Sequence, residues 1–282
     1  MKLSIDIVTW NSAGDIAGCL DSIHSEHQFE VAVVDNGSSD STLDVLSQFH
    51  HLKLIRNACN RGYAFANNQG IKESCGEYVL LLNPDTKMGP DAIDRLVEFL
   101  DANPDFGAVA PRLVNPDGST QFSVRSFPTA WSTLCEVTGL ARLFPLSRAF
   151  GGWRMARFDY TKPAEVDQPM ASCLLIRRKV LEQLHGFDQT FPIFYNDVDL
   201  SYRMKRAGWK TAYVPDAVVI HRRGASTRQV RPKMIWESHR SLFRYLRKHD
   251  RSGFFWFKAV VLLPLLELAA LVRVWKYRLS RK

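Results

Sequence analysis

Two aspartates stand where a parallel α/β sheet would present reactive side chains. Asp85 follows the stretch Tyr78–Leu82, which has no polar face and is typical of a buried strand, ended here by an Asn-Pro pair. Asp35 follows another apolar run, Phe29–Val34. Ligands of open α/β sheets bind outside the carboxyl ends of the strands, so both carboxylates are predicted to face a ligand.

The sequence lacks a glycine-rich phosphate cradle. No Gly-x-Gly-x-x-Gly follows the first strand, and no Gly-Lys-Ser or Gly-Lys-Thr occurs. A bound diphosphate would therefore need another counter-charge, which a divalent metal held by Asp85 would supply. Carboxylate and phosphate oxygens suit Mg²⁺ or Mn²⁺. The alternative interpretation of Asp85 is an Asx-turn residue before a helix over Met88–Leu100.

The loops after the first two strands carry groups suited to a nucleoside. Asp35 can accept hydrogen bonds from a pyrimidine N–H or from ribose, and Trp10 can stack on a base. Asn11 stands beside Trp10. For Ser38 and Asp40 the competing interpretation is a turn and helix-capping role.

The elements that would position these groups alternate in type. Strands are expected over Leu3–Val8, Phe29–Val34, Leu52–Ile55 and Glu77–Leu82, with helices over Asp15–Ile23, Thr42–Phe49 and Ala64–Glu73. This alternation predicts right-handed crossovers and a parallel, doubly wound sheet.

The second half of the chain is expected to make the sheet mixed. Strands are predicted over Ala108–Leu113, Gln121–Arg125, Met170–Ile176, Trp209–Val214 and Val218–His221, and helices over Asp91–Leu100 and Val180–Leu184. The first two of these strands flank the turn Asn115–Gly118 and predict a hairpin. Residues 128–160 have a weaker pattern, consistent with a mobile lid or with a packed helical excursion.

A helix expected from Phe194 to Gly208 has two aspartates in its first turn. Asp197 and Asp199 suit the helix dipole whatever else they do. Two positions apart, they face different directions, so one can point into a cleft while the other caps the helix. His221 ends the last strand, as a ligand or as a packed histidine.

Five motifs in order resemble family 2 glycosyltransferases of the GT-A fold, in particular the bacterial rhamnosyltransferase-like branch. They are Val34-Asp35-Asn36-Gly37-Ser38-Ser39-Asp40, Asn60-Arg61-Gly62-Tyr63-Ala64, Leu82-Asn83-Pro84-Asp85-Thr86, Asp197-Val198-Asp199-Leu200 and His221-Arg222-Arg223-Gly224-Ala225-Ser226. The resemblance runs from Leu3 to Asp250. It implies a mixed, mostly parallel central sheet flanked by helices.

The resemblance also implies inverting transfer of a sugar from a nucleoside diphosphate donor to an acceptor hydroxyl. Its donor-binding residues would be Trp10, Asn11, Asp35, Arg61 and Asn83. Asp85 and His221 would hold Mg²⁺ or Mn²⁺, and the metal would stabilise charge on the departing diphosphate. Asp197 would be the general base that takes the proton of the attacking hydroxyl.

Two positions depart from the family pattern. The metal motif often begins with Asp, and this chain has Asn83, which leaves one carboxylate and predicts modest metal affinity. The base is often preceded by Glu, and this chain has Asn196, which alters the surroundings of Asp197.

Charge divides the chain into two parts. The whole sequence of 282 residues is 46% hydrophobic and carries a net charge of +8, but residues 222–282 hold sixteen Lys or Arg against three Asp or Glu. The preceding part is therefore mildly acidic and the tail strongly basic, which indicates nucleic acid or an anionic membrane as partner. The five scattered cysteines form no Cys-x-x-Cys pair and are expected to be reduced, and no signal peptide is predicted at the amino terminus.

The apolar character of the tail favours the membrane over nucleic acid. Residues 253–275 are mostly apolar, but Lys258, Pro264 and Glu267 interrupt them, so an interfacial helix is predicted rather than a span. Basic side chains flank this segment: Arg247, Lys248, Arg251, Arg273, Lys276, Arg278, Arg281 and Lys282. The alternative is a buried helix or an oligomer contact.

The predicted organisation is a GT-A domain over 1–225, with a nucleotide-binding half (1–85) and an acceptor and catalytic half (86–225), followed by a basic helical segment over 226–282. The predicted enzyme is cytoplasmic and peripheral on the cytosolic face of the membrane. It would transfer a sugar, by family branch rhamnose from dTDP-rhamnose, to a saccharide acceptor carried on a polyprenyl diphosphate. The competing hypothesis is a non-catalytic nucleotide-sugar-binding or membrane scaffold protein. A nucleotidyltransferase is disfavoured because the loop Thr9–Gly14 has no Lys or Arg.

Overall fold

The structure, a computed structural model, describes residues 1–222, 231–250 and 253–279. The chain divides into two units. The larger comprises Met1–Val124, Asp159–Pro192 and Asn196–Ser226, and the smaller comprises Arg125–Phe158, Ile193–Tyr195 and Thr227–Lys282. The predicted boundary at 225/226 and the motif residues Arg223–Ser226 lie outside the described residues, as do Arg251, Arg281 and Lys282. The division into domains stays a prediction.

The first part of the larger unit is a parallel sheet with helical crossovers. Its elements are β1 (Leu3–Thr9), α1 (Ile16–Leu20), β2 (Phe29–Asp35), α2 (Thr42–Leu46), β3 (Leu52–Arg56), α3 (Tyr63–Glu73) and β4 (Tyr78–Leu82). β1 pairs in parallel with β2 and β4, and β2 pairs in parallel with β3. Every residue of β1 and β4 is buried, as expected of strands covered on both faces.

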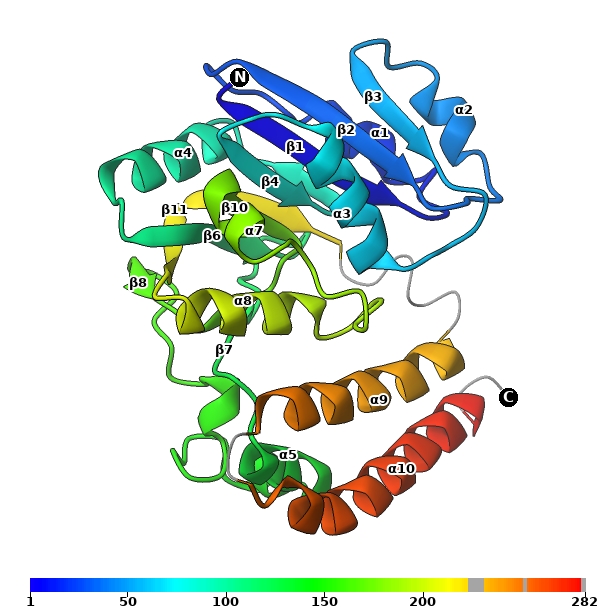
Figure 1. Ribbon diagram of the computed structural model, residues 1–282, viewed down its shortest axis with the longest axis vertical. Helices are drawn as coiled ribbons and strands as arrows, with labels where there is room; N and C mark the ends of the chain where they lie inside the picture. The colour runs from blue at the N-terminus through cyan, green and yellow to red at the C-terminus, as the bar shows by residue number, and fades with distance from the viewer. Residues whose placement is uncertain (223–230, 251–252, 280–282) are drawn as a thin grey trace. The chain divides into compact units, whose positions relative to one another are not determined.

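Antiparallel strands extend this sheet. They are β5 (Thr86–Met88), β8 (Ala164–Glu165) and β10 (Cys173–Arg177), joined by β6 (Phe106–Val114) and β11 (Lys210–His221), which run parallel to each other. Within the described residues the sheet has nine strands, ordered β3-β2-β1-β4-β10-β6-β11-β5 with β8 beside β11 (Figure 1). The predicted mixed sheet flanked by helices is confirmed.

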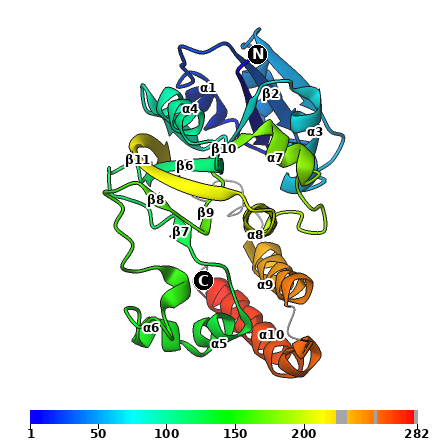
Figure 2. The same ribbon diagram turned by 60° about the vertical axis from the view of Figure 1, so that its left-hand side comes forward.

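Helices cover both faces of the sheet, and two cores result. α1, α2 and α4 (Ala92–Ala102) pack on one face, whereas α3, α7 (Arg178–Gln183) and α8 (Asn196–Arg206) pack on the other (Figure 2). Successive side chains of a strand point to opposite faces. Leu80 of β4 therefore belongs to the first core and Leu81 to the second.

The segment after Asp85 differs from the prediction. Thr86–Met88 forms β5 and α4 begins at Ala92, so the helix start at Met88 in the Asx-turn interpretation of Asp85 is wrong. The helix predicted over Asp91–Leu100 is confirmed. β5 forms because it pairs with the distant end of β11, where His221 is the register partner of Thr86. A strand of three residues has no periodicity of its own that would reveal it.

The predicted hairpin forms only at its turn. The N–H of Gly118 donates to the carbonyl of Asn115 (2.9 Å), and Val114 bridges to Thr120. The return arm then leaves the main sheet and ends in the short strand β7 (Val124–Arg125), which pairs with β9 (Gln168–Pro169).

β11 is one strand, and the two strands predicted there are joined. Its pairing with β6 shifts register between Val214 and Val218. Pro215 lies inside this irregularity, where the missing N–H of proline costs no ladder hydrogen bond.

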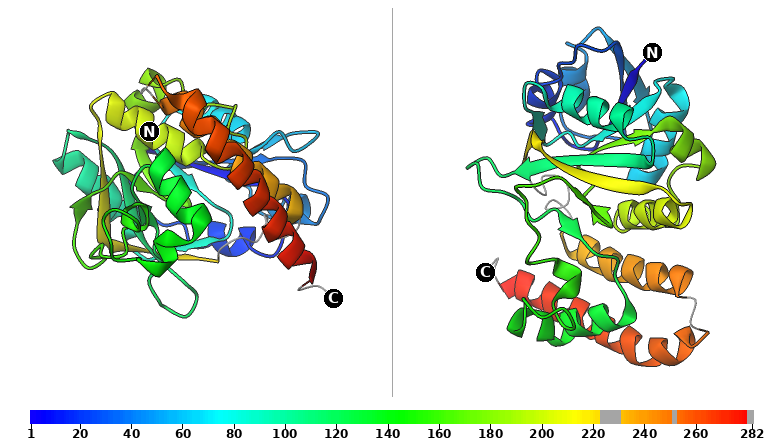
Figure 3. Two further views of the ribbon diagram at one scale, coloured as in Figure 1. Left: turned by 90° about the horizontal axis from the view of Figure 1, so that it is seen from below. Right: turned by 90° about the vertical axis from the view of Figure 1, so that its left-hand side faces the viewer.

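The smaller unit is helical in its described part. It contains α5 (Ala130–Thr138), α6 (Leu140–Leu143), the 3₁₀ turn η1 (Gly152–Arg154), α9 (Arg231–His249) and α10 (Phe255–Leu279). α10 packs against α9 and α5 (Figure 3). Residues 128–160 thus contain packed helices, one of the two structures expected for them. The buried side of α10 repeats every three or four residues: Phe255, Ala259, Leu262, Leu266, Ala270 and Val274.

A carboxyl group for which no role was predicted lies inside the larger unit. Asp6 of β1 is fully buried and faces α3 at Gly70, where an added Cβ would lie 1.8 Å from Asp6 Oδ1. Neither of its oxygens accepts a hydrogen bond from the described residues. Burial raises the pKa of Asp6 well above the ordinary value, with Arg178 opposing the shift. The fold therefore disfavours the charged form of Asp6.

Candidate active site

The loops after β1 and β2 are tied together at the carboxyl edge of the sheet. Asp35 is 1% exposed, and its carboxylate accepts from Thr9 Oγ1 (3.1 Å), the Ser38 N–H (3.0 Å) and Ser38 Oγ (2.5 Å). Asp40 accepts from the N–H groups of Thr42 (3.1 Å) and Ala13 (3.2 Å). The turn role expected as one interpretation of Ser38 and Asp40 is therefore present, whereas the N-cap residue of α2 is Ser41, whose side chain makes no capping hydrogen bond.

Asn11 joins the same two loops from the other side. Its backbone has a φ of 50°, a left-handed conformation that asparagine adopts more readily than most residues. Its N–H donates to Ser38 Oγ (2.9 Å), and its Oδ1 accepts from the Ser39 N–H (2.8 Å). Trp10, next in the chain, is half-buried. Three of the predicted donor-binding residues, Trp10, Asn11 and Asp35, thus lie on the loops after β1 and β2, which hydrogen bonds join to each other.

Asn36 is a site residue that sequence reasoning missed. It is 2% exposed, its Oδ1 accepts from the Arg61 N–H (3.1 Å), and its Nδ2 donates to Asn60 Oδ1 (3.1 Å) and to the Gly62 carbonyl (3.2 Å). The loop that carries Arg61 is therefore fixed by the loop after β2. The signal was available in the Asn-Gly pair after Asp35, since a buried amide beside a turn glycine is suited to bind backbone groups.

Arg61 itself is exposed and stacks its guanidinium 3.5 Å from the centre of the Phe65 ring. Gly62 follows with a φ of 94°, and a Cβ there would lie 2.8 Å from Pro192. Only glycine fits both the backbone conformation and the contact. The position of the Arg61 side chain at the start of α3 depends on it.

Asn83 closes the turn that presents Asp85. Its carbonyl accepts from the Thr86 N–H (3.2 Å) and Thr86 Oγ1 (2.6 Å), and Pro84 occupies the second position that favours such a turn. Its side-chain Oδ1 accepts from Tyr63 Oη (3.2 Å). Asn83 thus positions Asp85 and faces α3 at the same time.

Asp85 and His221 face each other across the β5–β11 pairing. Asp85 Oδ1 lies 3.4 Å from His221 Nε2, and the two side chains are 10% and 5% exposed. The backbone N–H of Arg222 donates to the Asp85 carbonyl (2.8 Å). The structure therefore brings together the two predicted metal ligands.

A carboxylate oxygen and an imidazole nitrogen form a donor set that fits Mn²⁺ or Mg²⁺, with imidazole favouring Mn²⁺. Among the described residues no three His, Cys, Asp or Glu side chains gather to hold a metal. An ion here would complete its coordination with oxygens of the diphosphate and with water.

The two aspartates at the start of α8 have different environments. Asp199 is fully buried and pairs with Arg203, Nε to Oδ2, at 2.7 Å. The same guanidinium donates to the carbonyls of Leu184 and Gly186 (both 2.8 Å), so Asp199 holds α8 in place. Asp197 is partly exposed, and its Oδ1 accepts from the Val198 N–H (2.8 Å).

Asp197 and Asp85 both act on Tyr63. Burial raises the pKa of Asp197, because the protein disfavours its charged form. Burial also raises the pKa of Tyr63, and the negative charges of Asp6, Asp197 and Asp85 add to that effect.

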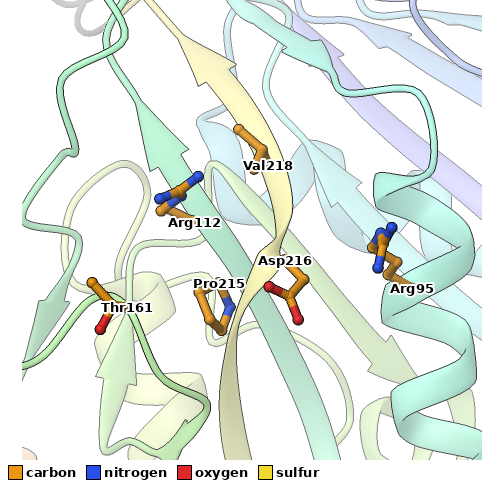
Figure 4. A pocket seen from close by; sticks show the side chains of 6 residues that line it. All are labelled: Arg95, Arg112, Thr161, Pro215, Asp216 and Val218. Atoms are coloured by element: carbon orange, nitrogen blue, oxygen red, sulfur yellow. The ribbon is translucent and has the colours of Figure 1, made fainter.

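A separate pocket of about 310 Å³ lies beside the irregular part of β11 (Figure 4). Its lining residues are Arg95, Arg112, Thr161, Pro215, Asp216 and Val218. None of the predicted site residues is among them, so this pocket is distinct from the edge that carries Asp85.

Sequence comparisons identify the family of the chain. A family described as "Glycosyl transferase family 2" matches residues 4–184. The N-acetylglucosaminyl-diphospho-decaprenol L-rhamnosyltransferase of Mycobacterium tuberculosis is 31% identical over 249 residues, which are 83% of this chain and 79% of that protein. A low-salt glycan biosynthesis hexosyltransferase of Haloferax volcanii is 30% identical over 72% of this chain and 62% of its own length.

Solved structures support the fold. A Pyrobaculum calidifontis mannosyltransferase, solved with GDP-Man and Mn²⁺, superposes with a TM-score of 0.61 at 18% identity, covering 95% of this chain and 73% of that one. Residues 1–349 of Staphylococcus aureus TarS superpose with a TM-score of 0.56 at 16% identity, covering 97% and 82%. At such identities the likeness concerns the fold alone. The family match and the similarity over most of the chain show that this protein is a glycosyltransferase and belongs to glycosyl transferase family 2.

Proposed function

We propose that the enzyme transfers rhamnose, from dTDP-rhamnose, to a saccharide acceptor carried on a polyprenyl diphosphate, in cell-surface polysaccharide biosynthesis. The similarity over 83% of the chain to a protein named as an L-rhamnosyltransferase of a diphospho-decaprenol acceptor carries this proposal. The acceptor would bind on the cytosolic face of the membrane.

The proposed chemistry is a single displacement with inversion. Asp197 takes the proton of the acceptor hydroxyl while the oxygen of that hydroxyl attacks the anomeric carbon of the donor sugar. The bond between the anomeric carbon and the diphosphate oxygen breaks in the same step. A raised pKa makes Asp197 a stronger proton acceptor than an ordinary aspartate wherever it remains ionised. The fixed orientation of α8 through Asp199 and Arg203 supports this role, because it holds the first turn of the helix in place.

In this proposal Asp85 and His221 hold Mn²⁺ or Mg²⁺. The ion would supply positive charge for the departing diphosphate, which no glycine-rich loop of this chain offers. Both side chains are largely buried and face each other, and this arrangement supports the role.

The proposed donor site lies along the joined loops after β1 and β2. Trp10 stacks on the base, Asn11 and Asp35 bind the nucleoside, and Arg61 neutralises the diphosphate. Asn83 supports the donor side of the site through its turn. Thr9 and Ser38 already donate to the Asp35 carboxylate, so few of its lone pairs remain for hydrogen bonds from the nucleoside.

A transfer assay tests the proposal. Purified enzyme is given dTDP-rhamnose, UDP-glucose or GDP-mannose with a short polyprenyl-diphosphate N-acetylglucosamine, and the product anomer is determined by NMR. We expect transfer from dTDP-rhamnose alone, with inverted configuration. Preference for another donor would contradict the rhamnose assignment, and no transfer from any donor would favour the scaffold hypothesis.

We further propose that α10 lies on the membrane surface. Among the described residues it is the one helix whose length and apolar composition would allow a span. One of its sides packs within the smaller unit, whereas the other exposes large apolar side chains: Phe254 before it, then Trp256, Phe257, Val260, Val261, Leu263, Leu268, Leu271, Val272, Trp275 and Leu279. A helix with one packed and one apolar exposed side suits the interface better than the lipid core.

Pro264 and Glu267 also support an interfacial position. Proline has no N–H, so the carbonyl of Val260 loses its helical donor, and Val260 is 76% exposed. Water at the interface can bind that carbonyl, but the hydrocarbon core cannot. Glu267 is exposed on the same helix and would be costly in hydrocarbon.

Vesicle flotation tests the membrane proposal. The full chain is mixed with phosphatidylcholine vesicles with or without phosphatidylglycerol. We expect flotation with the anionic vesicles, weakened by salt, and its loss on Trp256→Ser combined with Phe257→Ser. Lys276→Gln with Arg278→Gln should lose only the salt-sensitive part. Equal flotation of all variants would contradict the role of α10.

A further inference from the structure

Gln121 contacts His221 through both ends of its side-chain amide. It is 2% exposed, its Oε1 lies 3.0 Å from His221 Nδ1, and its Nε2 donates to the carbonyl of His221 (2.7 Å) and to Asn115 Oδ1 (2.8 Å). Sequence reasoning treated Gln121 only as part of a hairpin. Its position behind the ring makes it a direct neighbour of a proposed metal ligand.

The orientation of this amide is determined by its neighbours. A backbone carbonyl can only accept, so the group that faces the His221 carbonyl must be the NH₂ of Gln121. The Oε1 of Gln121 is then left for His221 Nδ1. An oxygen acceptor at this distance requires that Nδ1 carry the hydrogen.

The hydrogen bonds of the turn Asn115–Ser119 require the same orientation of the Gln121 amide. Ser119 Oγ donates to Asp117 Oδ1 (2.6 Å), and Asn115 Nδ2 donates to Ser119 Oγ (2.8 Å). Hydrogen bonds from Ser119 lower the pKa of Asp117, so this carboxylate is ionised at neutral pH and can only accept. Asn115 must therefore turn its Oδ1 toward Gln121, which again leaves Oε1 of Gln121 for the ring.

We propose that Gln121 fixes His221 as the Nδ1–H tautomer. Two sets of hydrogen bonds each orient its amide: one to the His221 carbonyl, and one to the chain formed by Asn115, Ser119 and Asp117. In the neutral ring the lone pair then lies on Nε2, on the side of Asp85. Gln121 is a positioning residue in this scheme, because it acts through His221. The consequence for a divalent cation rests on the metal site proposed above, whereas the tautomer itself does not.

The fixed tautomer gives a reason for the pair at 3.4 Å. Asp85 Oδ1 and an unprotonated His221 Nε2 are both electron-pair donors, and both side chains are at least nine-tenths buried. Such a pair is favourable when a cation binds both atoms. Partners that set the tautomer of a ligating histidine commonly change metal affinity by about 10- to 100-fold.

NMR of the unmodified protein tests the tautomer directly. Metal-free protein labelled with ¹⁵N-histidine is examined at neutral pH, and the signals of His221 are assigned by their loss in His221→Asn. We expect a proton on Nδ1 and none on Nε2. A proton on Nε2, alone or together with one on Nδ1, would overturn the proposal.

Two substitutions separate positioning from a purely structural role. Gln121→Met removes both the acceptor for Nδ1 and the donors, whereas Gln121→Glu keeps an oxygen acceptor for Nδ1 and loses the amide donors. We expect a lower melting temperature in both. Mn²⁺ affinity, measured from the free-ion EPR signal, should fall about 10- to 100-fold only in Gln121→Met.

Equal loss of affinity in the two variants would show that Gln121 only stabilises the fold, and would overturn the proposal. Asn115→Ala is a further control, since it removes one bond of the chain but leaves the His221 carbonyl to orient Gln121. It should keep the Nδ1–H tautomer. If the wild-type tautomer is Nδ1–H and Mn²⁺ does not bind, the tautomer proposal stands and the metal site fails.

Discussion

His221 meets Asp85 because Thr86, the residue after Asp85, is the register partner of His221 in the antiparallel β5–β11 pairing. The two side chains belong to strands far apart in sequence, and a strand of three residues fixes their distance. Displacing β5 by one residue would turn the neighbouring side chains to the opposite face. The proposed metal site therefore depends on the short strand β5 as much as on its ligands.

Replacing Asp85 with Asn should abolish metal-dependent binding of the donor nucleotide. The melting temperatures of the wild-type protein and of the variant are measured with dTDP, UDP, GDP or CDP, each with and without Mn²⁺ or Mg²⁺. A ligand at 100 times its dissociation constant stabilises by about 2.7 kcal/mol, so the shift is easily seen. Asp91→Asn, which removes only an exposed pair with Arg95, is the control and should behave as wild type.

Replacing Asp197 with Asn should reduce transfer by about 10²- to 10⁴-fold and leave donor binding unchanged, because only proton acceptance is lost. Burial raises the pKa of Asp197, so the acid side of the rate profile should lie at higher pH than for an ordinary aspartate. The rate falls as pH decreases through this pKa. Unchanged turnover in the variant would remove the proposed mechanism.

Replacing Asp6 with Asn should stabilise the protein at neutral pH. The folded pKa of Asp6 lies above the unfolded one, so stability is greatest below the unfolded pKa and falls as pH rises toward the folded pKa. Asparagine does not ionise in the unfolded chain and avoids this loss, which is about 1.4 kcal/mol per pH unit over that window. Urea unfolding at pH 4 to 8 measures it, and a stability difference independent of pH would contradict it.

Replacing Gly62 with Ala should weaken donor binding and lower the melting temperature. Alanine combines a strained φ with a Cβ 2.8 Å from Pro192, so the backbone before α3 must move, together with Arg61. Gly208→Ala is a matched control: its φ is 89°, but nothing lies within 4 Å of the added Cβ. It should cost about 1 kcal/mol and leave nucleotide affinity unchanged. Equal losses in both variants would show that the contact with Pro192 is unimportant.

The sequence revealed those parts of the fold that have a local signal. β1 and β4 were visible as apolar runs, and Asp85 was visible because an Asn-Pro pair ends β4. All five cysteines are free thiols, as expected, and three of them are buried: Cys19, Cys135 and Cys173. In these cases neighbouring residues determine the structure almost without help from distant ones.

The parts that were missed depend on distant partners. β5 exists through β11, and the side-chain amide of Gln121 binds the carbonyl of His221, one hundred residues away. The sequence indicated that Asp197 and Asp199 face different directions, but not that Asp199 pairs with Arg203, which also binds two backbone carbonyls. Spacing in the sequence shows which side chains share a helical turn, but not which of them forms an ion pair in the folded protein.

The hydrogen bonds among Asn11, Asp35 and Ser38 have a thermodynamic consequence. They fix the loops after β1 and β2 during folding, so a molecule that binds along them meets little remaining backbone freedom. The entropy of ordering is lost before the ligand arrives, and the association rate is not limited by a search through loop conformations. This edge of the sheet is a preformed binding surface. Its shape and charge, rather than the closing of a loop, determine which ligand it selects.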